Sequence, residues 1–345
     1  MLEQKVSYMN KELWYTDGPA TLNKEEEMFL AGATGVRLTF SYSTQEYQHN
    51  RAIVAKEAAA RVGKSCFIVA DLTGEKFRLG RFNDAPTVTV TQDHFVRLIP
   101  TDITEPTLQD LTLPIPESSF YEFQEQVKKG NIITVGDGSV MLEVLFVGED
   151  EISATTLSDG TIDQMRGLTI QDTNFRPRSL TSKDIDDLAH ILSLSIYDAV
   201  AISFVSSEEE IIRIKEAAST QNRQIAVIAK IETAAGVANI EKICMNADCV
   251  MAARGDLALA IPWVELPSTV KAIADTAKAA SIPWILATQI AEGLQRFVIP
   301  TRAEICDLAH WRQEGCAGVL LSYETAFGAK PNLAVECTAK ILARW

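Results

Sequence analysis

Short apolar segments rich in β-branched residues recur along the chain, and polar residues stand at their carboxyl ends. Between most of them lie stretches with helical periodicity, such as residues 208–219 and 264–280. Strands that alternate with helices predict βαβ units, and eight such strands predict a closed (β/α)8 TIM barrel of the α/β class. The expected strands are residues 13–16, 36–40, 66–71, 198–204, 225–231, 249–253, 284–288 and 318–322.

The pattern changes over residues 83–177, where short β-branched runs alternate apolar with polar positions. Turn signals such as Gly136-Asp137-Gly138 separate these runs. We therefore expect a small, mostly antiparallel β domain inserted after the third barrel strand, with residues 1–82 and 178–345 as the two parts of the barrel. Thr181-Ser182-Lys183-Asp184 has the form of a capping box and predicts the helix at which the chain re-enters the barrel.

Composition narrows the possible partners. The 345 residues carry a net charge of −14, which disfavours nucleic acid and anionic membranes. No apolar stretch approaches the ~20 residues of a membrane span, and residues 1–5 lack the pattern of a secretory leader. Six scattered Cys without a CxxC pair are typical of buried free thiols in a cytoplasmic protein. An anionic ligand must then be held by a few local cations and backbone amides.

The end of the fifth expected strand carries a cation and a carboxylate. Lys230 and Glu232 are two residues apart, so strand alternation points both side chains to the same side. A lysine in a barrel interior is costly unless it is paired. The two residues therefore predict either a catalytic centre or a structural ion pair that closes the barrel mouth.

The sixth and seventh strand ends predict an anion and metal site. Gly255 and Asp256 follow the sixth strand, where backbone amides at the start of a short helix suit a carboxylate or a phosphate. Asp256 together with Glu232 offers the oxygen ligands that Mg²⁺ prefers, although Asp256 could also be a simple N-cap. Thr288 adds a hydroxyl at the end of the seventh strand.

The second and third strands supply the local cations. Arg37 lies on the second strand, Asp71 ends the third, and Lys76 and Arg78 follow shortly after. Each basic residue could instead be an ordinary solvated or ion-paired surface residue. Taken together, the strand ends indicate a metal-assisted reaction on an anionic substrate.

These residues fall into long, ordered motifs that resemble the pyruvate kinase family over roughly residues 16–342. The motifs are Ala229-Lys230-Ile231-Glu232, Ala253-Arg254-Gly255-Asp256-Leu257, Ala287-Thr288-Gln289 and Pro300-Thr301-Arg302-Ala303-Glu304. The inserted β domain stands where that family has its mobile, β-barrel-like lid. The family's C-terminal allosteric domain has no counterpart in this sequence, so sugar-phosphate regulation is not expected.

The resemblance implies a phosphoryl transfer between phosphoenolpyruvate (or a close analogue) and ADP, with pyruvate and ATP as the other small-molecule partners. It assigns catalytic roles to Lys230, Thr288 and Arg37, and Mg²⁺ or Mn²⁺ to Glu232 and Asp256. It further implies substrate binding by Gly255, Asp256 and Thr288, and nucleotide binding by Arg37, Arg78 and Arg166. The segment 300–304 resembles a stretch near a subunit contact in that family, which favours a homo-oligomer.

Departures from the family pattern change two expectations. Lys76 stands where potassium-dependent members have Glu, and Leu72 where they have Thr, so the resemblance implies that potassium is not required. Lys76 would then supply the positive charge of the monovalent-cation site that includes Asp71 and Ser41.

Other departures lie on the nucleotide side. The family usually has Asn, Ser and His where this chain has Thr39, Ser41 and Tyr42, and Gly where it has Tyr323, so ADP binding is open to question. One alternative is therefore a metal-dependent lyase or aldolase that enolises 2-oxo acids without a nucleotide. Another is a weakly active regulatory paralogue.

Overall fold

The computed structural model describes residues 12–41, 43–83, 85–107, 111–172 and 175–345. The expectations about a leader over residues 1–5 and about Tyr42 fall outside the described residues.

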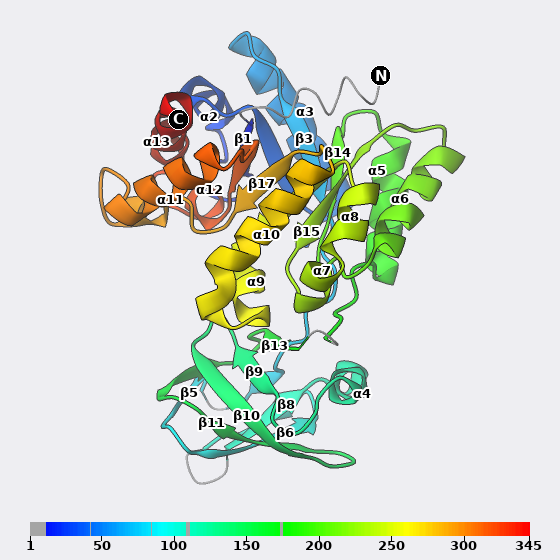
Figure 1. Ribbon diagram of the computed structural model, residues 1–345, viewed down its shortest axis with the longest axis vertical. Helices are drawn as coiled ribbons and strands as arrows, with labels where there is room; N and C mark the ends of the chain where they lie inside the picture. Colours follow the sequence, from blue (N-terminus) through cyan, green and yellow to red (C-terminus); the bar gives the residue numbers. More distant parts are fainter. Residues whose placement is uncertain (1–11, 42, 84, 108–110, 173–174) are drawn as a thin grey trace.

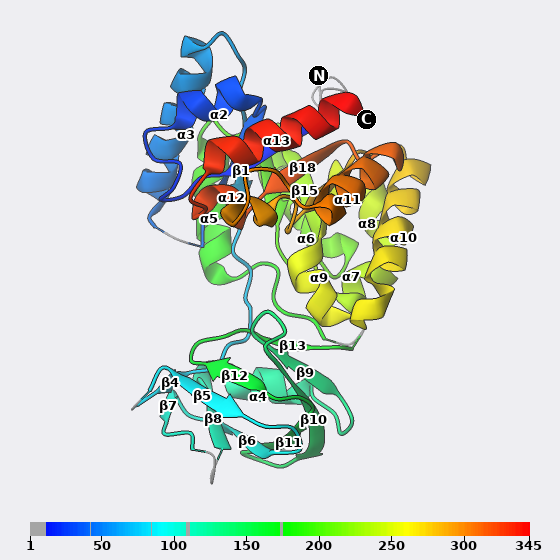
Figure 2. The same cartoon turned by 90° about the vertical axis from the view of Figure 1, so that its left-hand side faces the viewer.

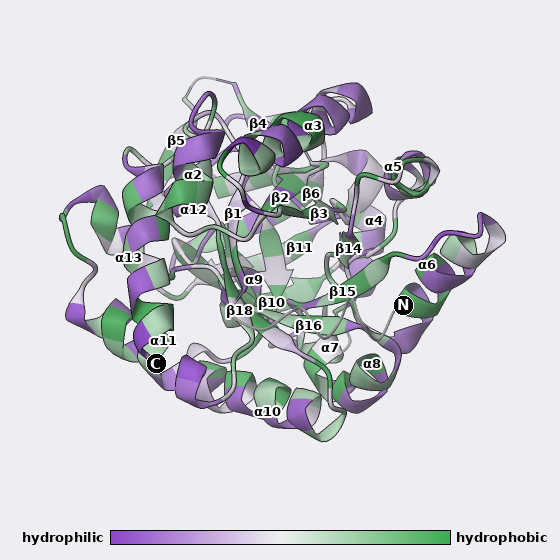
Figure 3. Ribbon diagram, turned by 90° about the horizontal axis from the view of Figure 1, so that it is seen from above, coloured by the Kyte–Doolittle hydropathy of each residue, from purple (hydrophilic) through white to green (hydrophobic). Residues whose placement is uncertain are grey.

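Eight parallel strands close into a barrel, in which each strand pairs with its neighbours and β1 pairs with both β2 and β18 (Figures 1 and 3). The (β/α)8 prediction is confirmed, and no strand end differs from its expected position by more than two residues. The strands are β1 (Glu12–Thr16), β2 (Gly35–Thr39), β3 (Phe67–Asp71), β14 (Ala199–Ile202), β15 (Ala226–Ile231), β16 (Cys249–Ala253), β17 (Trp284–Ala287) and β18 (Gly318–Leu321).

Helices surround the barrel and bury its outer face (Figure 3). Thr181 and Asp184 form the predicted capping box at the start of α5, because each side chain bonds to the other residue's backbone N–H. The helices are α2 (Glu25–Ala31), α3 (Gln45–Arg61), α5 (Ser182–Ser193), α6 (Glu208–Thr220), α7 (Ala234–Ala238), α8 (Ile240–Asn246), α9 (Arg254–Ala260), α10 (Leu266–Ala279), α11 (Arg302–Gln313), α12 (Tyr323–Ala326) and α13 (Pro331–Arg344), with 3₁₀ turns at Trp263–Glu265 and Glu292–Gln295.

The barrel interior is a separate, packed core. Trp14, Ile228, Met251 and Ile285 point inward and are buried, so the barrel is filled by side chains rather than open. Trp14 stacks on Phe67 with ring centroids 5.3 Å apart. Chemistry is thereby confined to the strand ends.

The insert is a β domain with its own hydrophobic core, built around Phe77, Phe120, Phe123 and Phe175. Its main sheet has the order β13-β9-β10-β11-β6-β8. Its elements are β4 (Arg81–Phe82), β5 (Thr87–Val90), β6 (Phe95–Pro100), β7 (Ile103–Thr104), β8 (Leu111–Ile115), α4 (Glu117–Glu125), β9 (Ile132–Val135), β10 (Val140–Val147), β11 (Ile152–Thr156), β12 (Gly160–Asp163) and β13 (Leu168–Ile170).

Among the described residues of the insert, the mostly antiparallel prediction holds for five of seven strand pairs, whereas β6–β8 and β4–β7 are parallel. Helix α4 was also not expected. Its buried apolar residues Phe120 and Phe123 form too short a pattern, directly after β8, for the sequence to distinguish a helix from another strand.

The chain crosses between the barrel and the insert twice, after β3 and before α5 (Figures 1 and 2). Strand β13 contacts α9, which follows the carboxyl end of β16. The insert therefore lies at the carboxyl ends of the barrel strands. At one crossing the Asp184 carboxylate accepts the Thr73 amide at 2.8 Å, which ties the outgoing segment to the returning helix α5.

The structure shows how exposed the cysteines are and whether any described helix could span a membrane. The prediction that all cysteines are buried is wrong for Cys306, which is exposed, and for Cys337, which is half-buried against the hydrophobic core. In the part of the chain that the structure describes, every helix is too short or too polar to cross a membrane.

Candidate active site

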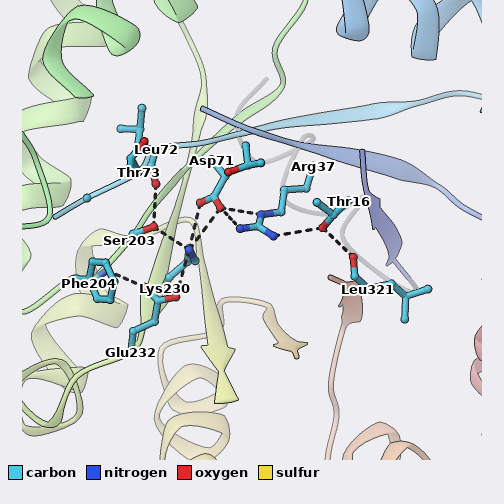
Figure 4. A network of polar contacts seen from close by, with 12 residues as sticks. Thr16, Arg37, Asp71, Leu72, Thr73, Ser203, Phe204, Lys230, Glu232 and Leu321 are labelled. Atoms are coloured by element: carbon cyan, nitrogen blue, oxygen red, sulfur yellow. Dashed lines mark hydrogen bonds and ion pairs between the residues drawn. The ribbon is translucent and has the colours of Figure 1, made fainter. Parts of the chain in front are cut away.

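A buried network of charged side chains lies at the carboxyl ends of β2, β3 and β15, with Lys230 at its centre (Figure 4). The Lys230 ammonium donates to Ser203 Oγ at 2.8 Å and lies 3.2 Å from Glu232 Oε1 and 3.4 Å from Asp71 Oδ1. Its side chain is only 9% exposed. As expected from strand alternation, Lys230 and Glu232 share one side of β15.

Asp71 joins Lys230 to Arg37. Arg37 Nε donates to Asp71 Oδ2 at 2.7 Å, and a second guanidinium nitrogen lies 2.5 Å from the same oxygen. Arg37 also donates to Thr16 Oγ1 at 3.3 Å, and Thr16 in turn donates to the Leu321 carbonyl (Figure 4). Four barrel strands thus fix the position of one guanidinium group.

The network favours the ionised forms of Asp71 and Lys230. Burial alone would raise the pKa of Asp71, but Arg37 and Lys230 together hold that pKa below its usual value. Burial alone would lower the pKa of Lys230, but Asp71 and Glu232 raise it above its usual value. Lys230 is therefore a buried ammonium ion at neutral pH, placed where a negative charge could be stabilised.

Glu232 is held by a strained turn after β14. Its Oε2 accepts the backbone N–H of Phe204 at 2.8 Å, and Phe204 has a φ of 55°. Burial raises the pKa of the Glu232 carboxyl; Lys230 opposes that rise and the nearby Asp256 adds to it. Two carboxylates thus come close enough to repel each other.

Asp256 lies in the first turn of α9, where its carboxylate pairs with the Lys76 ammonium. The N-cap of α9 is Ala253, so the alternative interpretation of Asp256 as an N-cap is wrong. Lys76 reaches Asp256 from the segment that leads into the insert, and its stem packs against Gly167, where a Cβ would lie 2.3 Å from Lys76 Cε. Asp71, which was expected beside Lys76 in the monovalent-cation site, contacts Arg37 and Lys230.

The donor set fits a divalent cation. Glu232 and Asp256 supply hard oxygen ligands, and a cation between them would relieve their mutual repulsion. Among the described residues, no three His, Cys, Asp or Glu side chains are grouped to hold a metal. A bound cation would therefore complete its coordination with substrate oxygens and water, as Mg²⁺ commonly does.

Thr288 adopts a strained backbone conformation beside the start of α9. Thr288 and Gln289 have φ values of 74° and 54°, which are unfavourable for a β-branched residue and uncommon for any residue but glycine. Arg254 stabilises the turn by donating to the carbonyls of Thr288 at 2.8 Å and Gln289 at 3.0 Å. A Cβ at Gly255 would lie 3.1 Å from Thr288 Cγ2, so the predicted substrate-binding residues Gly255 and Thr288 are brought together.

The remaining predicted nucleotide ligands make their contacts in the insert. Arg78 is exposed and donates to the Met165 carbonyl at 3.3 Å. Arg166 pairs with Asp163 at 2.8 Å and lies 3.8 Å from Asp137. Arg37, the third predicted ligand, belongs to the barrel network instead.

Arg37 lines one end of a cavity of about 640 Å³ between the carboxyl ends of β1, β2 and β18. Thr39 and Ser41 line it as well, and Tyr47, Tyr323 and Phe327 contribute its aromatic surface. The volume falls in the range of small-molecule sites. Tyr323 therefore leaves room for a ligand beside Arg37.

Three partners of the network were not foreseen from the sequence. Ser203 and Phe204 hold Lys230 and Glu232, and Thr16 holds Arg37. Ser203 and Thr16 stand at the ends of predicted strands, a signal that could have identified them. The Phe204 contribution is a backbone N–H in a left-handed turn, which side-chain chemistry cannot reveal.

The fold is a (β/α)8 barrel with a charged network at the carboxyl ends of its strands and a β domain next to them. This arrangement defines the class of barrel enzymes, in which the reaction takes place at the carboxyl face of the barrel. Comparisons with known proteins give the family. A family profile described as "Pyruvate kinase, barrel domain" matches residues 10–335, and the chain belongs to the pyruvate kinase family. The predicted family, fold class and enzyme class are thereby confirmed.

Two relatives illustrate the match. The pyruvate kinase of Thermococcus litoralis is 32% identical over 328 residues, covering 94% of this chain and 67% of that protein. That of Mycobacterium intracellulare is 33% identical over 332 residues, covering 95% and 68%. A crystal structure of a pyruvate kinase from Cryptosporidium parvum superposes with a TM-score of 0.88 at 25% identity, covering 99% of this chain and 70% of that one.

Proposed function

We propose that this protein transfers the phosphoryl group of phosphoenolpyruvate to ADP, yielding pyruvate and ATP, with Mg²⁺ or Mn²⁺ bound by Glu232 and Asp256. The buried ammonium of Lys230, ionised between Asp71 and Glu232, is the observation that carries the proposal. Phosphoryl transfer depends mainly on positioning and on neutralising charge, which is what such a group supplies.

Each barrel residue has a defined part in this reaction. Lys230 stabilises the phosphoryl oxygens and then the enolate, and Arg37 orients the phosphates from the opposite side of Asp71. The amides of Gly255 and Asp256, with the Thr288 hydroxyl, bind the substrate carboxylate. The bond from phosphorus to the enol oxygen breaks as a bond to an ADP oxygen forms, and the enolate gains a proton at its terminal carbon. Bound metal adds further charge neutralisation.

Arg78, in the segment that leads into the insert, and Arg166, within the insert, are the proposed nucleotide contacts. Arg78 is exposed and the Arg166 side chain is 48% exposed, and their contacts are with groups of the insert, so both can turn to a nucleotide if the insert closes over the barrel. We also propose that residues 83–177 act as this lid, with the barrel divided into residues 1–82 and 178–345.

Potassium independence is part of the proposal. Lys76 supplies a fixed positive charge in this region, and Asp71 and Ser41 are the other members of the proposed cation-site replacement. Because Lys76 pairs with Asp256 here, a divalent cation at Asp256 must displace or share that ammonium. A freed Lys76 would be available to the substrate phosphates or to Asp71.

One measurement tests the proposed activity. Pyruvate formation from phosphoenolpyruvate and ADP should be robust with Mg²⁺ or Mn²⁺, and it should change less than about twofold when K⁺ replaces tetramethylammonium. The absence of pyruvate from folded, metal-loaded protein contradicts the proposal. Solvent-deuterium exchange into pyruvate without nucleotide would then favour the lyase alternative, and the lack of both reactions would favour the regulatory paralogue.

We further propose a cytoplasmic homo-oligomer. Phe297, Val298 and Ile299 are 54–72% exposed and precede the Pro300–Glu304 motif, so an apolar surface lies beside the segment that resembles a subunit contact. Exposed apolar patches of this kind are typical of protein interfaces.

A further inference from the structure

The cavity beside Arg37 has an unusual outer wall. Tyr323 and Phe327 both line it, and each is 56% exposed. The two rings stack on each other, with centroids 5.8 Å apart and planes 29° from parallel. They are four positions apart along α12 and its C-cap, which places both rings on one face. A pair of partly exposed aromatic rings is thus left in water on the wall of the cavity.

The wall rests on a rigid support. Glu324, between the two rings in sequence, is fully buried and accepts the amides of Ile290 at 2.9 Å and Ser322 at 2.8 Å. Thr325 is also fully buried, and its Oγ1 accepts the Thr16 amide at 3.0 Å. The backbone that carries Tyr323 and Phe327 is therefore anchored to β1 and to the turn after β17, so the platform is ordered before a ligand binds.

The cavity also has a charged end, which is more deeply buried than the two rings. Arg37 is the only basic side chain among the described lining residues. Asp17, the acidic one among them, is neutralised by Arg51 at 2.7 Å. The cavity thus has one cationic end beside the Lys230 network and one flat aromatic end toward solvent. A ligand that matches both ends carries anionic groups at one end and a planar ring at the other, as a nucleoside diphosphate does.

We propose that Tyr323 and Phe327 form an aromatic wall on which the nucleotide base stacks, and that this wall sets the base preference of the protein. The inference rests on the proposed phosphoryl transfer, which places the nucleotide phosphates near Arg37. With a single cation in the described lining, stacking provides a large share of the affinity. Purines offer more ring area than pyrimidines, so ADP and GDP bind more tightly than UDP and CDP.

Kinetics with a nucleotide panel and paired variants test the wall. In the wild-type protein, the KM for UDP and CDP should exceed that for ADP about tenfold. The double variant Tyr323→Ala, Phe327→Ala should raise the KM for ADP about tenfold, as expected for loss of base stacking, with a much smaller change in the KM for phosphoenolpyruvate. Tyr323→Phe should keep the ADP preference. Tyr121→Ala, which removes an exposed ring in the insert, is the matched control.

The outcomes separate the two proposals. Wild-type turnover with equal KM values for all four nucleotides overturns the aromatic wall while leaving the proposed function in place. A double variant that keeps its ADP KM within twofold of the wild type overturns the wall in the same way. The absence of wild-type turnover overturns the proposed function, and the wall with it. The wild-type panel gives a result even if the double variant does not fold.

Discussion

At the residue scale, the site depends on residues whose unfavourable backbone conformations are stabilised by neighbouring groups. Thr288 has a φ of 74° and is fixed by Arg254, while Phe204 has a φ of 55° and donates its amide to Glu232. Strain of this kind costs on the order of 1–3 kcal/mol per residue and is concentrated at functional sites. Small changes next to these residues should therefore affect catalysis more than folding.

Gly255→Ala tests this expectation. The new methyl group would lie 3.1 Å from Thr288 Cγ2 and 3.4 Å from its Oγ1, so Thr288 must shift by a few tenths of an ångström. Since small misplacements are costly in catalysis, we expect kcat/KM for phosphoenolpyruvate to fall about tenfold or more. Thermal denaturation should change by no more than a few degrees, because alanine suits a helical turn. Unaltered kinetics would show that the Gly255–Thr288 contact does not position the substrate.

The cysteines offer a pH-dependent test. Burial raises the pKa of the thiols of Cys66 and Cys316 to about 12 and that of Cys244 to about 11. A raised folded-state pKa favours the protonated thiol, so these groups stabilise the fold below their unfolded pKa of about 8.5, and that contribution is lost as the pH rises toward 12. At pH 8, a thiol reagent should modify the exposed Cys306 first and the four buried thiols of Cys66, Cys244, Cys249 and Cys316 only after unfolding. Rapid modification of a buried thiol in the native protein would contradict this packing.

At the scale of elements, the barrel was predictable and the contacts between elements were not. Each barrel strand is a short, almost wholly buried apolar run with polar residues after it, a pattern that sequence alone displays. The same pattern correctly placed Lys230, Glu232 and Thr288 at one face. The partners of Lys76 and Arg37 depend on how the strands and the insert pack against one another, and no local sequence pattern indicates that packing.

Lys76 is the clearest case, because it joins the insert to the barrel. Its ammonium pairs with Asp256, and its stem packs on Gly167 of the insert. Lys76→Met keeps much of the apolar stem and removes the competing cation. We expect the Kd for Mn²⁺, measured by calorimetry without substrate, to fall several-fold. Lys215→Met, which removes a lysine paired with Asp248 on the outer surface, should leave it unchanged. A weaker Mn²⁺ affinity in Lys76→Met would mean that Lys76 supports the cation site rather than competing for it.

At the scale of the whole molecule, the acidic chain concentrates its few functional cations at one end of the barrel. Under the proposed function, the net charge of −14 leaves the capture of anionic substrates to Arg37 and Lys230 in the barrel and to the proposed lid contacts Arg78 and Arg166. The insert lies over that same end, through the contact of β13 with α9. The proposed reaction centre therefore lies at the end of the barrel that the insert covers.

The proposed oligomer is tested at the same scale. Val298 is 72% exposed within the apolar run 297–299, so Val298→Asp should shift the protein toward a smaller species in sedimentation analysis by placing a charge in the interface. Phe146→Asp, which changes a 62% exposed apolar residue in the insert, is the matched control. A wild-type protein that sediments as a monomer would contradict the proposed assembly.

The central claim is that the buried Lys230 ammonium drives phosphoryl transfer, and Lys230→Met tests it most directly. The change keeps the length of the side chain and removes the charge that lies 3.2 Å from Glu232 and 3.4 Å from Asp71. Initial rates of pyruvate formation from phosphoenolpyruvate and ADP should fall by at least about a thousandfold, in the range seen when a main electrostatic group is removed from an active site. A folded Lys230→Met protein with rates within tenfold of the wild type would contradict the account.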